Sequence, residues 1–162
     1  MTAKSSFLIR DVTVVDVEEL STLAHRIWRE HYTPIIGNEQ VEYMLGLWYS
    51  PEFLTKQVLD ESRLFLTAQV AGELKGYIQS SEQESHSFIH KLYIAPESQG
   101  QGLGKALLGA LPKGLPLSLR VNRDNHNSIA FYQHCGFKIV AEDVLDIGQG
   151  FVMDDYAMQR SI

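Results

Sequence analysis

The sequence predicts an α/β fold. Short apolar runs typical of strands alternate with stretches whose apolar residues recur at helical spacing, and glycine, proline or polar turns separate them. The expected order is a strand, two or three helices, three strands, a helix, a strand, a helix and two strands. No repeat or low-complexity tract divides the 162 residues, so we expect a single domain over 1–162 with a substantial core.

Capping residues and turns set the expected element boundaries. Thr13 and Asp16 have the spacing of a capping box, Asn38 can cap a second helix, and Ser50-Pro51 opens a third. The expected strands cover residues 7–11, 64–70, 74–80, 88–94, 117–121, 138–146 and 150–158. The expected helices cover residues 13–31, 39–47, 51–60, the stretch from the glycine loop to about 111, and 128–135. "TPIIGN" is expected to interrupt the chain after the first helix.

The stretch "APESQGQGLGKALL", residues 95–108, carries a glycine at every second position from Gly100 to Gly104. Glycines let backbone N–H groups approach a ligand closely, and the apolar run that follows predicts the first turns of a helix. A helix N-terminus preceded by such a loop is a binding site for an anion. We therefore expect an anion cradle here.

Two common phosphate-binding motifs do not match this loop. A Walker-type P-loop would need a glycine in place of Gln99 and a hydroxyl side chain in place of Ala106. A dinucleotide fingerprint would need a glycine at Leu107 and an acidic residue about 20 positions further on, where Arg120 and Arg123 lie. The spacing therefore excludes both classes of nucleotide-binding protein.

Gln99-x-x-Gly102-x-Gly104, between a predicted strand and a predicted helix, resembles the Q/R-x-x-G-x-G/A signature of the GNAT family of N-acetyltransferases. A second stretch, "NHNSIAFYQHCGF" (residues 125–137), resembles the family's downstream pattern N-x-x-[AS]-[IR]-x-[FL]-Y-x-x-x-G-F. The two motifs lie about 25 residues apart, as an intervening helix and strand require. The resemblance covers the chain from about Arg63 onward. It implies a splayed mixed sheet with helices on both faces, and direct transfer of acetyl from acetyl-CoA to an amine in a ternary complex.

The resemblance implies a coenzyme A site on the glycine loop, the strand before it and the helix after the asparagine motif. Loop amides hold the pyrophosphate without magnesium, and the pantetheine arm pairs with the strand edge. Asn125 hydrogen-bonds the arm, with a turn or cap as its alternative role. The residues assigned to the cofactor are Leu92, Tyr93, Ile94, Gln99, Gly100, Gln101, Gly102, Leu103, Gly104, Lys105, Asn125, Ser128 and Tyr132.

Tyr132 is the predicted catalytic acid. The family match places its hydroxyl beside the thioester sulfur, where a phenol can donate a proton to a leaving thiolate whose pKa is about 8.5 on the cysteine scale. On a helix beginning near Ser128, Phe131 is expected to point to the core and Tyr132 in another direction. A purely packing tyrosine is the alternative interpretation.

His90 is the predicted general base, because an alkyl ammonium with a pKa of about 10.4 must lose a proton before it attacks. Some family members carry a glutamate where this chain has Phe88. His90 lies two residues on, projects to the same strand face and has a suitable pKa range. A structural histidine, Glu84, the Glu30-His31 pair and a water relay are the alternatives.

Other reactive groups are assigned no role. Ribosomal-protein-type family members carry a glutamate where this chain has Arg120, which lowers the expectation of that activity. Cys135, the only cysteine, precedes Gly136 without an evident base partner, so we expect no acyl-enzyme. The six histidines show no metal-ligand spacing, and we predict no metal.

The acceptor is expected to be a small-molecule amine such as a polyamine or amino acid; antibiotic and peptide amines stay open. The family's variable walls are the first-helix region, here the aromatic-rich residues 28–49, and the last hairpin, which carries Asp154 and Asp155. Aromatic rings and carboxylates can receive a cation, with core packing and a solvated surface as the alternatives. A homodimer is left open.

The bulk composition narrows the remaining classes. A formal charge of −6 without a Lys/Arg cluster argues against a nucleic-acid partner. The N-terminal residues lack an apolar core of signal-peptide length and no run reaches the ~20 apolar residues of a membrane span, so we expect a cytoplasmic protein without a membrane partner. A peptide or protein N-terminal acetyltransferase and a non-catalytic acyl-CoA-binding module are the alternative functions. The presence of Tyr132 favours catalysis.

Overall fold

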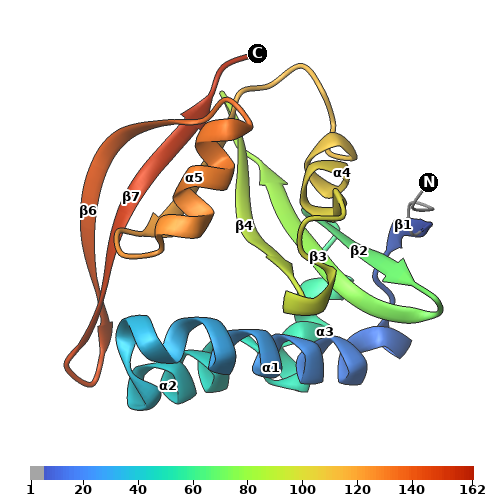
Figure 1. Cartoon of the computed structure of the whole chain (residues 1–162), viewed down its shortest axis with the longest axis horizontal. Coiled ribbons are helices and arrows are strands. Elements are labelled where there is room, and N and C mark those ends of the chain that lie inside the picture. The colour runs from blue at the N-terminus through green and yellow to red at the C-terminus, as the bar shows by residue number, and fades with distance from the viewer. Residues whose placement is uncertain (1–5) are drawn as a thin grey trace. The chain divides into compact units, whose positions relative to one another are not determined.

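The computed structural model describes residues 6–162, and Figure 1 shows the elements. The expectation about the N-terminal segment concerns in part residues 1–5, which lie outside the described residues. The strands are β1 Phe7–Asp11, β2 Arg63–Val70, β3 Glu73–Glu82, β4 Ser87–Ile94, β5 Leu117–Asn122, β6 Lys138–Gly148 and β7 Phe151–Arg160. The helices are α1 Val17–Ile36, α2 Asn38–Trp48, α3 Pro51–Leu59, α4 Leu103–Gly109 and α5 His126–His134, with short 3₁₀ turns at Val14–Asp16 and Pro96–Ser98.

The strands form a seven-stranded mixed sheet in the order β1-β2-β3-β4-β5-β7-β6, which confirms the predicted α/β class. β4 and β5 run parallel, whereas β1–β2, β5–β7 and β6–β7 are antiparallel. The chain divides into two compact units. The first comprises the residues up to Ser80 together with Lys91–Leu111, and the second comprises Ser81–His90 and Pro112–Ile162. The single domain expected from the length stays a prediction.

Three helices pack together in the first unit (Figure 1). α1 buries one face, and the Ser21 hydroxyl on that face donates to the backbone carbonyl of Tyr49 at 2.8 Å. The predicted end of this helix at His31 was wrong, because α1 continues to Ile36 with Pro34 in its last turn. Proline removes one backbone donor, a smaller loss in the last turn than in the middle of a helix.

Gly37 ends α1 and also starts α2. Its N–H donates to the carbonyl of Thr33 at 3.0 Å, and its φ of +86° is a conformation that favours glycine. Asn38 therefore lies at the first position of α2 and does not cap it, contrary to the prediction. The predicted cap of α3 is confirmed, since the Ser50 hydroxyl accepts from the N–H of Phe53 at 3.2 Å.

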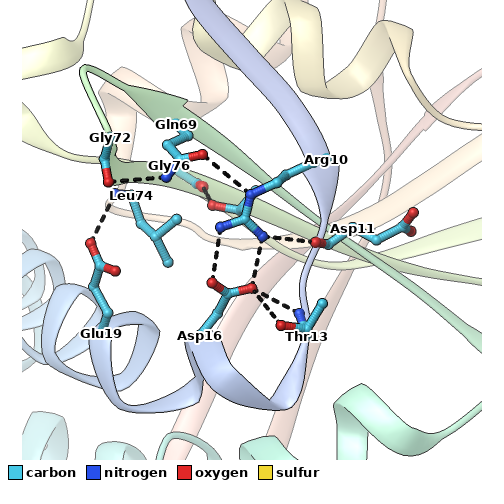
Figure 2. A network of polar contacts seen from close by, with 10 residues as sticks. Arg10, Asp11, Thr13, Asp16, Glu19, Gln69, Gly72, Leu74 and Gly76 are labelled. Carbon is cyan, nitrogen blue, oxygen red and sulfur yellow. Dashed lines mark hydrogen bonds and ion pairs between the residues drawn. The ribbon is translucent and has the colours of Figure 1, made fainter.

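Figure 2 shows the polar network that starts α1. Arg10 donates from two guanidinium nitrogens to the two carboxylate oxygens of Asp16, at 2.8 and 2.9 Å. Asp16 also accepts from the N–H of Thr13 at 2.8 Å, as its capping-box spacing predicts. The hydrogen bonds from Arg10 lower the pKa of Asp16 to about 2. The network ties β1 to the first turn of the helical region.

A tight hairpin joins β2 and β3, as predicted. Ala71 and Gly72 both have positive φ, +50° and +83°. Two consecutive positive φ values are the mark of a type I′ turn, whose twist matches that of paired strands. This conformation costs energy for Ala71, which has a Cβ, whereas Gly72 adopts it without that cost.

In the second unit, α5 lies in front of β7 in Figure 1, and the end of the helix region contacts that strand. Arg160 of β7 reaches the end of this helix region, where it donates to the carbonyl of Cys135 at 3.3 Å and lies 5.3 Å from the ring of Phe137. β4 and β5 pair from Ser87–Leu117 to Ile89–Leu119, whereas β5 itself continues to Asn122. Arg120 is therefore the first residue of β5 beyond that register.

Candidate cofactor and acceptor site

The glycine loop follows β4 and precedes α4, where the sequence predicts it. Gly100 and Gly102 have φ values of +80° and +86°, and a Cβ at either position would meet no heavy atom within 4 Å. Glycine is therefore needed there for the backbone conformation, and space beside the backbone is open. Gln99 donates from its side-chain amide to the carbonyl of Ile94 at 3.4 Å, so it holds the turn itself. The Gln101 side chain is exposed.

α4 places its N-terminus directly behind this loop. Gly102 occupies the cap position, and Leu103, Gly104 and Lys105 form the first turn. The first N–H groups of a helix have no acceptor within the helix and carry its partial positive charge. Leu103 and Leu107 are buried and hold the helix on the first unit, while the Lys105 side chain is exposed. The N–H groups and the partial positive charge at this helix N-terminus favour the binding of an anion.

The β4 residues expected to contact pantetheine contribute their side chains to packing. The ring of Tyr93 lies 5.7 Å from that of Trp28 and 6.1 Å from that of Tyr32, and the two tyrosine hydroxyls are 3.3 Å apart. Leu92 and Ile94 are half-buried. The proposed cofactor contacts use backbone groups, so the packing role and the cofactor role are compatible.

Asn125 and Tyr132 lie in the second unit, at the start and in the middle of α5. The Asn125 side chain accepts from the N–H of Ser128 at 3.4 Å and caps the helix, which was the alternative role considered for it. Tyr132 is 8 % exposed, and its ring lies 5.4 Å from that of Phe131 and 5.5 Å from that of Phe137. The expected orientations were wrong: Tyr132 is buried, whereas Phe131 is half-buried. The catalytic role of Tyr132 stays a prediction.

His90 lies on the strand face that the alternation predicts. Its ring is 4.9 Å from that of Phe88, and its Nε2 is 2.7 Å from the Ser81 hydroxyl. That contact gives His90 a structural partner, as the alternative interpretation required. Of the other candidate bases, Glu84 and Glu30 are exposed. The general base stays a prediction.

Three charged side chains meet on neighbouring strands of the second unit. A guanidinium nitrogen of Arg120 on β5 lies 3.0 Å from a carboxylate oxygen of Asp143 on β6 and another lies 3.5 Å from one of Asp155 on β7. Burial raises the pKa of Asp155 to about 6; Arg120 opposes this rise, and the charges of Asp154 and Asp143 add to it. Asp154 differs from Asp155 in exposure and in partner, because its side chain is 46 % exposed and pairs with Arg123 at 3.1 Å. The sequence indicated both aspartates without distinguishing them.

Residues 23–137 match the family model described as the acetyltransferase (GNAT) family. The chain belongs to this family. It is 29 % identical over 159 residues to a spermidine N(1)-acetyltransferase of Thermoplasma acidophilum, covering 92 % of this chain and 96 % of that protein. The crystal structure of a PaiA N-acetyltransferase from the same organism, in complex with coenzyme A, matches with a TM-score of 0.80 at 26 % identity and covers 97 % of this chain and 99 % of that one.

The ribosomal-protein-S18-alanine N-acetyltransferase of Escherichia coli has the same fold, with a TM-score of 0.72 at 20 % identity, covering 97 % of this chain and 94 % of that one. The family resemblance inferred from the two motifs is therefore confirmed, and this chain is an acetyl-CoA-dependent N-acetyltransferase. The glycine loop fits the cosubstrate: two left-handed glycines and a helix N-terminus present backbone donors, which suit a pyrophosphate without a metal.

Neither a metal cage nor a membrane-spanning helix is found in the part of the chain that the structure describes. Within residues 6–162, no three His, Cys, Asp or Glu side chains are arranged to hold a metal ion. None of the described helices combines the length and the apolar character needed to cross a membrane. The absence of a metal cofactor stays a prediction.

Lys91 is a buried charged residue that no sequence motif indicated. It is 7 % exposed, and its Nζ donates to the side-chain carbonyl of Gln57 at 2.8 Å and to the backbone carbonyl of Trp48 at 3.2 Å. The same nitrogen lies 4.2 Å from the centre of the Tyr49 ring. Burial, with a smaller effect of the Arg63 charge, lowers the pKa of Lys91 to about 7. The alternation of strand residues places Lys91 on the same face as the apolar Ile89. This is the sequence signal that could have predicted the burial of Lys91.

Proposed function

We propose that this enzyme transfers the acetyl group of acetyl-CoA to a primary amine of a polyamine. The observation that carries this choice is the similarity to a spermidine N(1)-acetyltransferase, which extends over 92 % of this chain. The formal charge of −6 agrees with a cationic acceptor. The likeness to the ribosomal-protein enzyme concerns the fold alone, and Arg120 departs from the glutamate expected of that type.

The proposed binding site for acetyl-CoA has three parts. The backbone N–H groups from Gly100 to Lys105 bind the pyrophosphate, and the β4 backbone from Leu92 to Ile94 pairs with the pantetheine amides. The Asn125 side chain contacts the arm from the start of α5. The acetyl thioester is the acyl donor.

The chemistry of the proposal needs two proton transfers. The neutral amine nitrogen attacks the carbonyl carbon, so that a C–N bond forms and the C–S bond breaks. Tyr132 donates its hydroxyl proton to the departing sulfur, and His90 accepts the proton that the amine loses. His90 then releases its proton to solvent and the Tyr132 phenolate takes one up, which returns both side chains to their starting protonation states.

A thiol-release assay tests the acceptor. Wild-type enzyme with acetyl-CoA is offered putrescine, spermidine and spermine, with amino acids, aminoglycosides and short peptides as comparison amines, and acetyl-CoA binding is titrated by calorimetry. We expect the highest kcat/KM with a polyamine. A higher kcat/KM with another amine class would overturn the polyamine assignment. Tight binding of acetyl-CoA without turnover would indicate a binding module.

Tyr132→Phe tests the acid. We expect kcat to fall by about 100-fold or more, because a phenol that protonates the leaving group is lost while the ring and its packing remain. Acetyl-CoA affinity is expected to change little. Tyr156→Phe, on β7 of the same unit, is the matched control and keeps wild-type kcat. An unchanged kcat in Tyr132→Phe would remove this residue from the mechanism.

A further inference from the structure

Asp155 is a buried carboxylate whose hydrogen-bonding capacity is not used by the fold. The residue is 3 % exposed, and its nearest opposite charge is Nε of Arg120 at 3.5 Å. A carboxylate has several acceptor positions, and buried ones are normally filled by donors. Among residues 6–162, no N–H or O–H donates to the Asp155 side chain.

The neighbouring side chains are unsatisfied as well. Nε and Nη2 of Arg120 are buried and form no hydrogen bond within the described chain, although both lie within ion-pair distance of carboxylate oxygens. The N–H bonds therefore do not point at those oxygens. The hydroxyl of Ser118, two residues earlier on the same face of β5, is also buried without a partner among the described residues. Three polar groups on one face thus have unused hydrogen-bonding capacity.

This polar face is opposite to the strand face that contacts the end of α5 in the second unit. Met158 and Arg160 alternate with Asp155 along β7, and Arg160 reaches Cys135 at the end of α5. Because successive strand residues point to opposite faces, Asp155 points away from α5. Arg120 lies one residue past the last β4–β5 pair, Ile89–Leu119, so the cluster lies where that register ends.

The charges of the cluster do not balance. Arg120 contributes +1, and Asp143 and Asp155 contribute −1 each when ionised, which leaves −1. A buried carboxylate left without full compensation is unfavourable, and a cation with N–H donors balances the charge and supplies the hydrogen bonds that the Asp155 carboxylate lacks. A primary ammonium group supplies one positive charge and three donors.

We propose that Asp155 binds an ammonium group of the acceptor, and that the ion pairs of Arg120 with Asp155 and with Asp143 keep the three side chains close together. This inference rests on the proposed function, and it names the residue that selects a polyamine. The adjacent Asp154 is excluded from this role, because it points to the other face of β7 and pairs with Arg123. The site lies entirely within the second unit.

Asp155→Asn tests the assignment with spermidine as the varied substrate at saturating acetyl-CoA. We expect KM for spermidine to rise 10-fold or more, while the calorimetric Kd of acetyl-CoA stays within a factor of two of wild type. Titration of spermidine into the enzyme loaded with coenzyme A should show the same loss of affinity. Asp154→Asn is the matched control and is expected to keep the wild-type KM.

A second variant covers the case in which Asp155→Asn fails to fold. Asp143 is at the exposed side of the cluster, so Asp143→Asn keeps the fold and is expected to raise KM for spermidine two- to threefold. An unchanged KM in the folded variants, with wild-type turnover of spermidine, would overturn the assignment of Asp155 alone. Absence of turnover with any polyamine in the wild-type enzyme would overturn the proposed acceptor and, with it, the inference.

Discussion

Lys91 in the first unit and Asp155 in the second are both buried charged side chains on strands, and their surroundings differ. Nζ of Lys91 donates to two oxygens and lies over an aromatic ring. Asp155 has an ion-pair neighbour at 3.5 Å and accepts no hydrogen bond within the described chain. The hydrogen bonds of Lys91 are made by residues of the protein itself, whereas we propose that a bound ligand donates those of Asp155. Burial alone therefore does not identify a functional charge; unused hydrogen-bonding capacity does.

The same physical cause shifts both pKa values in opposite directions. Burial disfavours the charged form of either group, which lowers the pKa of Lys91 to about 7 and raises that of Asp155 to about 6. Both residues therefore change charge near neutral pH. The difference between them lies in what each side chain contacts, and variants of each residue can test it.

The largest effect on stability is expected from Lys91→Met. Methionine has a similar length but no donor, so the buried oxygens of Gln57 and Trp48 lose their partner, at a cost of about 2–3 kcal/mol in the free energy of unfolding. Urea denaturation measures the loss. Lys113→Met, on an exposed loop, is the control and should change stability by less than about 0.5 kcal/mol. If Lys91→Met instead raises KM for spermidine at unchanged stability, the comparison with Asp155 fails.

The pH dependence of stability should have opposite signs for the two residues. Unfolded Lys91 keeps its proton up to the ordinary lysine pKa of 10.5, whereas the folded form loses it near 7, so its contribution to stability rises with pH in that window. Folded Asp155 keeps its proton up to about 6 and the unfolded form only to 3.8, so its contribution falls as pH rises through that window.

Each slope should disappear in the variant that lacks the group. Urea denaturation at intervals from pH 4 to 10, on wild type, Lys91→Met and Asp155→Asn, measures this difference, whose upper limit is about 1.4 kcal/mol per pH unit. Asp155→Asn is consequently expected to be more stable than wild type at pH 7. Parallel curves for wild type and either variant would contradict the burial argument for that residue.

The smallest effect is expected from Glu97→Gln, a charged residue at the surface. Glu97 pairs with Arg26 at 2.8 Å and Lys75 at 2.9 Å, and these hydrogen bonds hold its pKa well below the usual range. Its side chain is 45 % exposed, so solvent screens the pairs and we expect a loss below about 1 kcal/mol. Salt should reduce this loss further. A salt-independent loss as large as that of Lys91→Met would contradict the comparison.

Local chemistry made much of the fold predictable. Capping residues placed the start of α3, glycine chemistry placed the β2–β3 turn, and the two motifs identified the family. The predicted end of α1 was wrong because proline commonly interrupts a helix, whereas here α1 continues through Pro34 and ends at Gly37. In the last turn, the loss of one backbone donor is tolerated, and a sequence pattern does not show which turn is the last.

The sequence by itself determined which residues carry special backbone conformations and which form the two family motifs, because these depend on neighbours a few positions away. Only the tertiary structure decided that Lys91 is buried and hydrogen-bonded. It also decided that Asp155 is buried and accepts no hydrogen bond from residues 6–162, while Asp154 pairs with Arg123. The reason is that burial and partners come from segments distant in sequence. Asp155 meets Arg120, 35 positions earlier, only because β7 pairs with β5 in one particular register.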